Sequence, residues 1–397
     1  MRAGSGDPAA AAVVAGTLVG NDRIEAPGDA EEIALVDASR SLFGSQSPMA
    51  LWSADHQVVL YNSWRWESET EMAGRRPGDP VATPAIRVKD LARGTDTVLA
   101  EGAQTIAWRG EGPVAYTQAD DPVWRMNERY VGHVVVRDSL SSPPQRWTDT
   151  SDRYIVLAWA GDHLLFHRVP PEREGGGELL AATGPGRIHS LGPDTTTLLG
   201  LSPDGRYAFV LTDSEGGRSL DGLRYGLVEV ATGRSAGTVD VGAVPAGQVL
   251  GGALPLGAWD GDQVVIETSL FALDDGQVAD GQPALAIFDW DPEGPALALS
   301  TVIPVDASVA PWAEEPYFTD DHRRVQAISI DRLPEPADPD QPPEPPEPFE
   351  PYYIVVDCEV ATATCQAVPL DKPGAGHQLT PLRNPSRPSA SDVEEEQ

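Results

Sequence analysis

A phrase of about ten residues recurs six times along this chain, and it constrains the fold more than any other feature. Each copy contains a small residue, an aromatic residue or leucine, a tight turn rich in Asp or Gly, and an apolar run. The copies occupy residues 50–60, 106–116, 157–166, 199–209, 257–266 and 316–325. A period of roughly 40–60 residues is typical of proteins that stack one supersecondary unit many times.

One position in each copy is aromatic or leucine. Because an aromatic side chain with a functional role need not return at the same place in every repeat, we interpret this position as packing between neighbouring repeats. These anchor residues are Trp52, Trp108, Trp159, Leu201, Trp259 and Phe318.

A second hairpin follows most copies of the phrase. It is clearest at residues 86–99, 226–239, 286–297 and 353–368, and weaker at 131–136 and 178–191. Two hairpins per repeat give four antiparallel strands. The predicted fold is therefore an all-β propeller of six four-stranded blades, with seven blades as the alternative.

One copy of the phrase carries a family resemblance. The run from Leu201 to Val210, Leu-Ser-Pro-Asp-Gly-Arg-Tyr-Ala-Phe-Val, resembles the strand–turn–strand signature of TolB-like and WD40-type propeller proteins. The resemblance implies the fold and the repeat register over about residues 45–370. It implies no particular activity, because such propellers host many unrelated functions.

The two ends of the chain differ from the repeats. We expect a flexible N-terminal segment over 1–28, the propeller over 29–371, and a disordered acidic tail over 372–397. A Pro/Glu-rich insertion at 335–351 interrupts the sixth blade. Within 30–43, Ile33, Val36, Leu42 and Phe43 have near-helical spacing, which predicts a short helix. The alternative is that this segment supplies a strand that closes the ring.

The formal net charge of −33 narrows the classes of partner. It repels phosphate backbones and therefore argues against a nucleic-acid partner. It is compatible with high solubility alone, or with a cationic partner. No apolar run approaches the roughly 20 residues of a membrane span. We expect a monomer, because a closed propeller leaves few strand edges to pair.

Cys358 and Cys365 are the two cysteines of the chain. If residues 361–362 form a two-residue turn, the two cysteines face each other across the last hairpin. This arrangement predicts a disulfide and an extracytoplasmic location, either secreted or anchored through a segment outside this chain. The alternative is a pair of free thiols in a cytosolic hairpin.

Motifs for catalysis or metal binding are weak. His56, His163 and His322 follow an acidic residue at the same turn of three repeats, which turn chemistry explains better than a shared site. Residues 289–294 imitate the start of a calcium loop, and 274–280 could also contact Ca²⁺. We favour plain turns, and predict no catalytic residue, no metal site and no cofactor, with structural calcium as the weaker alternative.

The connections between the second and third strands of the repeats are long and are predicted to share one end of the propeller. They contain aromatic and arginine residues outside the repeat pattern, of the types common in binding sites. As the partner-binding set we propose Trp64, Arg65, Trp66, Trp124, Arg125 and Phe271. The alternative is that the tryptophans fold onto the blades as small cores.

The predicted function is non-enzymatic. We expect a recognition or scaffold module of the bacterial cell envelope or exterior, binding a protein or small ligand of unknown identity on the long connections. A hydrolase or lyase with its site at the central channel is the alternative. A third possibility is the sensor domain of a membrane protein.

Overall fold

The structure is a computed structural model in which all regular elements of the described residues are strands. The described residues are 17–19, 23–25, 32–35, 50–53, 55, 57–66, 81–110, 112–125, 130–149, 152–169, 177–192, 195–213, 223–253, 257–274, 277–278, 281–310, 313–319, 322–330, 353–369 and 377–379. None of them forms a helix that is long and apolar enough to cross a membrane.

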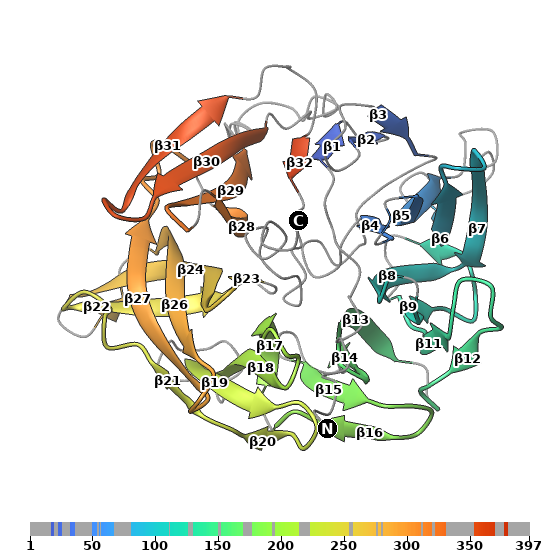
Figure 1. The fold of residues 1–397 in the computed structure, drawn as a ribbon, viewed down its shortest axis with the longest axis horizontal. Helices are drawn as coiled ribbons and strands as arrows, with labels where there is room; N and C mark the ends of the chain where they lie inside the picture. Colours follow the sequence, from blue (N-terminus) through green and yellow to red (C-terminus); the bar gives the residue numbers. More distant parts are fainter. Residues whose placement is uncertain are drawn as a thin grey trace, which may run out of the picture.

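The described strands form seven sheets arranged in a ring, so the chain is an all-β propeller (Figure 1). Six sheets follow the six repeats, and we number these blades 1 to 6. The seventh, here called the closing sheet, has the order β3-β2-β1-β32 and joins strands from both ends of the chain. Its strands are β1 (Thr17–Val19), β2 (Arg23–Glu25), β3 (Glu32–Ala34) and β32 (His377–Leu379).

The first three blades have four strands each in repeat order, innermost first. Blade 1 has β4 (Ala50–Trp52), β5 (Val58–Trp66), β6 (Val81–Asp90) and β7 (Thr95–Glu101). Blade 2 has β8 (Ala103–Trp108), β9 (Val114–Gln118), β11 (His133–Arg137) and β12 (Gln145–Arg146). Blade 3 has β13 (Arg153–Ala160), β14 (His163–Val169), β15 (Glu178–Ala182) and β16 (Ile188–Ser190).

The next three blades complete the repeats. Blade 4 has β17 (Thr195–Leu201), β18 (Tyr207–Asp213), β19 (Leu223–Glu229) and β20 (Arg234–Ser235). Blade 5 has β22 (Gln248–Ala253), β23 (Ala258–Asp260), β24 (Gln263–Asp274), β25 (Gln277–Val278), β26 (Gln282–Asp291) and β27 (Ala296–Pro304). Blade 6 has β28 (Glu314–Thr319), β29 (Arg324–Ile330), β30 (Tyr353–Glu359) and β31 (Thr364–Pro369).

Two strands cross from one blade to the sheet of another. β10 (Trp124–Arg125), which belongs to the chain of blade 2, pairs antiparallel with β6 of blade 1. β21 (Thr238–Asp240), which follows the last strand of blade 4, pairs parallel with β27 of blade 5. The blades are therefore tied together by backbone hydrogen bonds as well as by packing.

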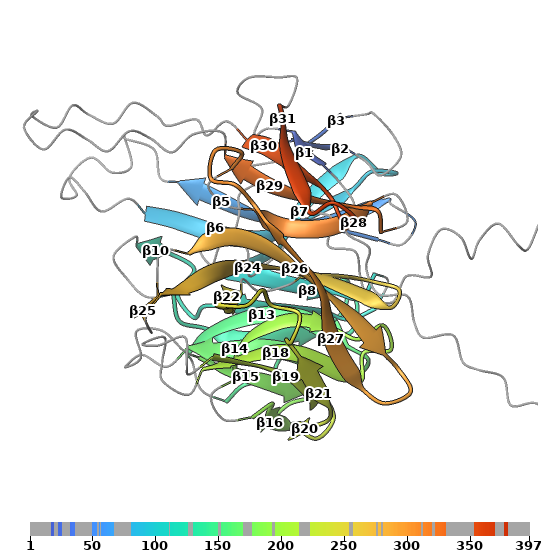
Figure 2. The same cartoon turned by 90° about the vertical axis from the view of Figure 1, so that its left-hand side faces the viewer.

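Alternating strand directions give the propeller two different ends. The turns that join the first to the second strand and the third to the fourth strand lie at one end, which we call the short-turn end. The second strands end and the third strands begin at the other end, which we call the long-connection end. In Figure 2 the long-connection end is on the left, where β10 and β25 lie.

The core lies between neighbouring sheets, and the anchor residues behave as predicted. Trp108 packs in a cluster shared by blades 1 and 2, and Trp259 in one shared by blades 4 and 5. Phe318 packs between blades 5 and 6, and Leu201 between blades 3 and 4. Each anchor thus faces the preceding blade, which explains why an aromatic or leucine is repeated there.

The repeated turn also has a physical cause. In blade 1 the Ser53 hydroxyl donates to Asp55 Oδ1 at 2.6 Å and accepts from the Val58 amide at 2.9 Å. In blade 4 the Ser202 hydroxyl makes the same bonds to Asp204 Oδ1 and from the Tyr207 amide. The serine and aspartate side chains thus replace backbone partners inside the turn.

Two features near the chain ends differ from the prediction. The helix expected within 30–43 is wrong, because β3 (Glu32–Ala34) is a strand paired with β2, as the alternative proposed. The near-helical spacing of apolar residues was outweighed by pairing in the closing sheet. β1 and β2 lie within segment 1–28 and β32 within 372–397, beyond the predicted limits of the propeller. The insertion at 335–351 lies outside the described residues.

Candidate functional site at the long-connection end

Polar side chains are buried mainly at one end of the propeller. Among the described residues, all buried polar or charged side chains except Ser53, Ser202 and Asp357 lie near the middle of the blade strands or closer to the long-connection end. These residues are Asn62, Ser63, Gln104, Thr105, Thr117, His133, Thr148, His167, Thr195, Glu267, Thr268 and Ser329. Because burying polar groups is costly, their concentration marks this end as the candidate site.

Trp64 belongs to a small core at this end. Its side chain is 4% exposed and packs with Ala82 and Tyr130. The Tyr130 hydroxyl donates to the carbonyl oxygens of Gly102 at 2.6 Å and Thr117 at 3.0 Å, and burial raises its pKa. This cluster joins blade 1 to blade 2 near the long-connection end. It matches the alternative stated from the sequence, in which a tryptophan folds onto the blades as a small core.

The other two tryptophans are placed by backbone register. Trp66 on β5 and Trp124 on β10 both pair with Ala82 on β6, one from each side. The prediction grouped these two residues from separate connections, and the pairing places them at one level of the extended blade 1 sheet.

Arg65 and Arg125 lie on the same paired strands, each next to one of these tryptophans. Arg65 pairs with Thr83 and its side chain is exposed, and Arg125 pairs with Val81. Five of the six proposed binding residues are therefore brought together by three strands, while Phe271 lies in blade 5.

Phe271 is held between two glycines. A Cβ atom at Gly281 would lie 2.6 Å from Phe271 Cε1, and one at Gly251 would overlap the same ring. Gly251 is on β22, which pairs with β24, and Gly281 directly precedes β26. The ring is half-buried against these strands. It therefore has a packing role in addition to any contact with a partner.

A hydroxyl network joins blades 2 and 3 near the channel. Thr105 and Thr117 share a hydrogen bond of 2.9 Å, the Thr117 hydroxyl donates to the Tyr154 carbonyl, and the Val156 amide donates to Thr105 Oγ1. Thr105 has a φ of 50°, in the left-handed region. Its neighbour Gln104 is fully buried, and in the described part of the chain neither amide atom has a hydrogen-bond partner.

Two buried histidines at this end have different surroundings. His133 Nδ1 lies 3.1 Å from the Thr148 carbonyl, and its Nε2 lies 3.5 Å from Asp120, which also accepts from Arg146 at 2.6 Å. Burial lowers the pKa of His167 to about 4, against an opposing hydrogen bond to the Gly177 backbone. His167 is therefore neutral at pH 7.

Polar side-chain contacts join neighbouring blades at the short-turn end. Arg109 of blade 2 pairs with Asp162 of blade 3 at 3.3 Å and lies over the Trp159 ring. Asp260 of blade 5 pairs with His322 of blade 6 at 3.3 Å, and His322 stacks on Phe318. The His322 side chain therefore packs between blades 5 and 6. His56 lies outside the described residues.

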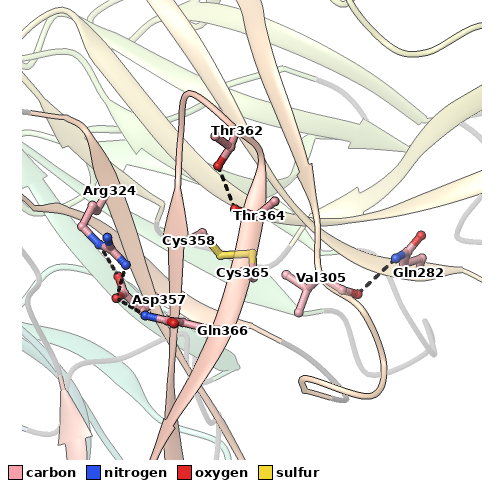
Figure 3. Close-up of a disulfide and its surroundings, with 9 residues drawn as sticks. All are labelled: Gln282, Val305, Arg324, Asp357, Cys358, Thr362, Thr364, Cys365 and Gln366. Carbon is pink, nitrogen blue, oxygen red and sulfur yellow. Dashed lines mark hydrogen bonds and ion pairs between the residues drawn. A yellow bond between two sulfur atoms is a disulfide. The ribbon is translucent and has the colours of Figure 1, made fainter.

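The predicted disulfide is present. Cys358 on β30 and Cys365 on β31 are cross-strand partners joined by an S–S bond, as Figure 3 shows. Cys358 is buried in the core between blades 5 and 6. Asp357 on β30 binds Arg324 of β29 through two oxygens and accepts from Gln366 of β31 at 3.4 Å.

The calcium-like segment forms a hairpin turn. Asp291 Oδ1 accepts from the backbone amides of Glu293 and Gly294, and Asp289 Oδ1 accepts from Gln263. Much of 274–280 lies outside the described residues. Within the described ranges, no group of three or more His, Cys, Asp or Glu side chains is placed to hold a metal ion.

Comparison with solved structures finds propellers at low identity. TolB from Acinetobacter baumannii is 17% identical with a TM-score of 0.34, over 74% of this chain and 67% of that one. The propeller domain of the Trilobed protease from Pyrococcus furiosus is 11% identical with a TM-score of 0.45, over 95% and 100%. The polysaccharide lyase Uly1 is 8% identical with a TM-score of 0.43, over 90% and 89%.

The likeness concerns the fold alone, and on that level the resemblance to TolB-like and other propellers holds. No protein-family model matches the sequence, and no curated protein matches it.

Sequence reasoning did not identify the buried polar groups. Gln104, Thr105 and Thr117 lie within apolar strand segments, and nothing in their spacing indicates that they meet Tyr154 of the next blade. The one available signal was Gln104-Thr105, two polar residues at positions that are apolar in the copies that contain Trp52, Trp159 and Trp259.

Proposed function

We propose that this protein is a recognition or scaffold module that binds a protein or small ligand at its long-connection end. The observation that carries the proposal is the asymmetry of the two ends. The strands that long connections join have their joined ends on one side of the propeller, where most of the buried polar side chains also lie, and short turns close the other side. Binding residues on rigid β scaffolds are commonly carried by such connections.

The binding surface that we propose is centred on blade 1 and β10. Arg65 is exposed there, and the ladder brings Trp66, Trp124 and Arg125 to the same part of the sheet. Tryptophan and arginine are enriched among the residues that dominate binding energies. Trp64 lies at the same end of blade 1, in the small core with Ala82 and Tyr130.

We further propose an extracytoplasmic location in the bacterial envelope or exterior. The support is the Cys358–Cys365 disulfide, since such bonds persist in oxidising compartments. Alkylation of free thiols in intact cells, before any lysis, tests this. Both cysteines should resist alkylation until a reductant is added, and ready alkylation would contradict the proposed location.

The binding surface is tested by affinity capture with the full oxidised chain from envelope extracts. Arg65→Glu reverses a charge on an exposed side chain and should leave stability within about 0.5 kcal/mol. Arg93→Glu is the matched control, because Arg93 is an exposed arginine in a turn of the same blade at the short-turn end.

A partner captured by the wild type and by Arg93→Glu, and lost by Arg65→Glu, supports the proposal. Loss with Arg93→Glu and retention with Arg65→Glu would move the surface to the opposite end. If neither variant changes capture, or nothing is captured, the proposed surface is wrong. The hydrolase or lyase alternative would then be tested by turnover assays.

A further inference from the structure

Two histidines meet at the short-turn end of blade 3, away from the proposed binding surface. His163 is the first residue of β14 and His189 lies on β16. Their rings contact edge to face, with centroids 6.0 Å apart and an interplanar angle of 87°. Both side chains are half-buried, and β15 lies between their strands in the same sheet.

The hydrogen bond of His189 fixes which of its nitrogens can bind a ligand. Its Nε2 lies 2.8 Å from the carbonyl oxygen of Val230 in blade 4. Because a carbonyl oxygen only accepts, Nε2 carries the proton, and the neutral ring therefore has its lone pair on Nδ1. Metal-binding histidines usually donate their other ring N–H to a carbonyl or carboxylate in this way, which orients the ring.

We propose that His163 and His189 bind one divalent transition-metal ion of the zinc, copper or nickel type at the seam between blades 3 and 4. Imidazole nitrogen suits these ions, whereas oxygen ligands suit calcium and magnesium. In the described part of the chain no third His, Cys, Asp or Glu completes the set, so water fills the remaining positions. This site is independent of the proposed function.

Blade 6 provides an internal comparison. His322 occupies the equivalent turn position to His163, but its ring stacks on Phe318 at 4.7 Å and its Nε2 lies 3.3 Å from Asp260. No second histidine contacts it among the described residues. A single histidine beside a carboxylate should bind the same ions much more weakly than the pair.

The test is titration of the full untagged chain with Zn²⁺ by calorimetry at neutral pH. We expect one ion per chain, with affinity reduced at least about tenfold in His163→Gln and in His189→Gln. His322→Gln is the matched control and should bind as the wild type does. Far-UV circular dichroism and the melting temperature show whether each variant is folded.

Electron paramagnetic resonance with one equivalent of Cu²⁺ gives a second readout. Coupling to two imidazole nitrogens in the wild type, and to one in either variant, is the expected result. Absence of specific binding, equal affinity in all four proteins, or loss of binding in His322→Gln alone would overturn the proposal. Coupling to a single nitrogen in the wild type would also overturn it.

Discussion

The two ends of this propeller are built from the same strands but stabilised in different ways. At the short-turn end, aromatic anchors pack against the preceding blade, and Arg109–Asp162 and Asp260–His322 link neighbouring blades at the surface. At the long-connection end, the blades are joined by buried hydroxyls, by Tyr130 and by the added strand β10. One end is repetitive, and the other differs from blade to blade.

This difference fits a division of roles, in which the short-turn end stabilises the fold and the long-connection end carries the proposed recognition surface. Repeated contacts contribute to every blade in the same way, so they suit a scaffold. Contacts that occur once, such as Thr105–Thr117 or Trp64–Tyr130, shape one place on the surface and therefore suit recognition. Four predictions test whether the two ends have these different roles.

The largest effect is expected at an anchor. Trp259 is 3% exposed and packs edge to face on Trp290 with centroids 5.5 Å apart. Trp259→Ala should lower the free energy of unfolding by about 3–5 kcal/mol, measured by denaturant titration. Trp64→Ala, in a cluster with fewer buried side chains, should cost less. Equal losses would show that the long-connection end contributes to stability as strongly as the anchors.

A pH effect should appear at the long-connection end. The pKa of His167 is about 4 in the folded chain, against about 6.5 for an ordinary histidine. The unfolded chain therefore binds the proton at higher pH, so acidification from pH 6.5 to 4 favours unfolding. The expected loss attributable to His167 is about 3 kcal/mol.

The control for this effect is His167→Gln, which cannot titrate. The difference in unfolding free energy between wild type and variant should change over that pH range, while the carboxylates affect both proteins alike. Parallel pH profiles would show that His167 is not buried as a neutral group.

The close packing of Gly251 and Gly281 on the Phe271 ring predicts a smaller effect on stability. Gly281→Ala should lower stability by about 1–3 kcal/mol, because the new methyl group would overlap the ring. Most of that cost should vanish when Phe271→Ala is added. Gly252→Ala on β22 is the matched control, since nothing lies within 4 Å of its Cβ position. If Gly281→Ala lowers stability as much in the Phe271→Ala background, the cost does not come from overlap with the ring.

The smallest effect is expected for an ion pair of the short-turn end. Arg109→Met removes the pair with Asp162, whose side chain is 91% exposed, and keeps part of the packing on Trp159. The expected loss is at most about 1 kcal/mol, and it should shrink as salt is added. A larger, salt-independent loss would mean that this pair matters as much as the anchors.

The sequence predicted what is local or repeated. The anchors Trp108 and Trp259 recur with the period of the blades, and the opposed positions of Cys358 and Cys365 follow from one short turn. Both features depend on neighbouring residues or on repetition.

Features that depend on distant pairing were not predicted. β1 and β32 are three-residue strands with no periodic pattern, and each is a strand because the other lies beside it. The position of Phe271 depends on a glycine of β22 and on the glycine that precedes β26, and that of Thr105 on the backbone of the next blade. Such arrangements produce no recognisable pattern in the sequence around each residue.

The pairing of β1 with β32 sets the order in which the ring can be completed. Leu18 pairs with Gln378, so a strand near the start of the chain takes its partner from near the end. While the chain emerges from a ribosome or an export channel, six blades can assemble one after another. The closing sheet must wait until the last strand has passed through. Ring closure is therefore a late step of folding, and the first strands spend the longest time exposed.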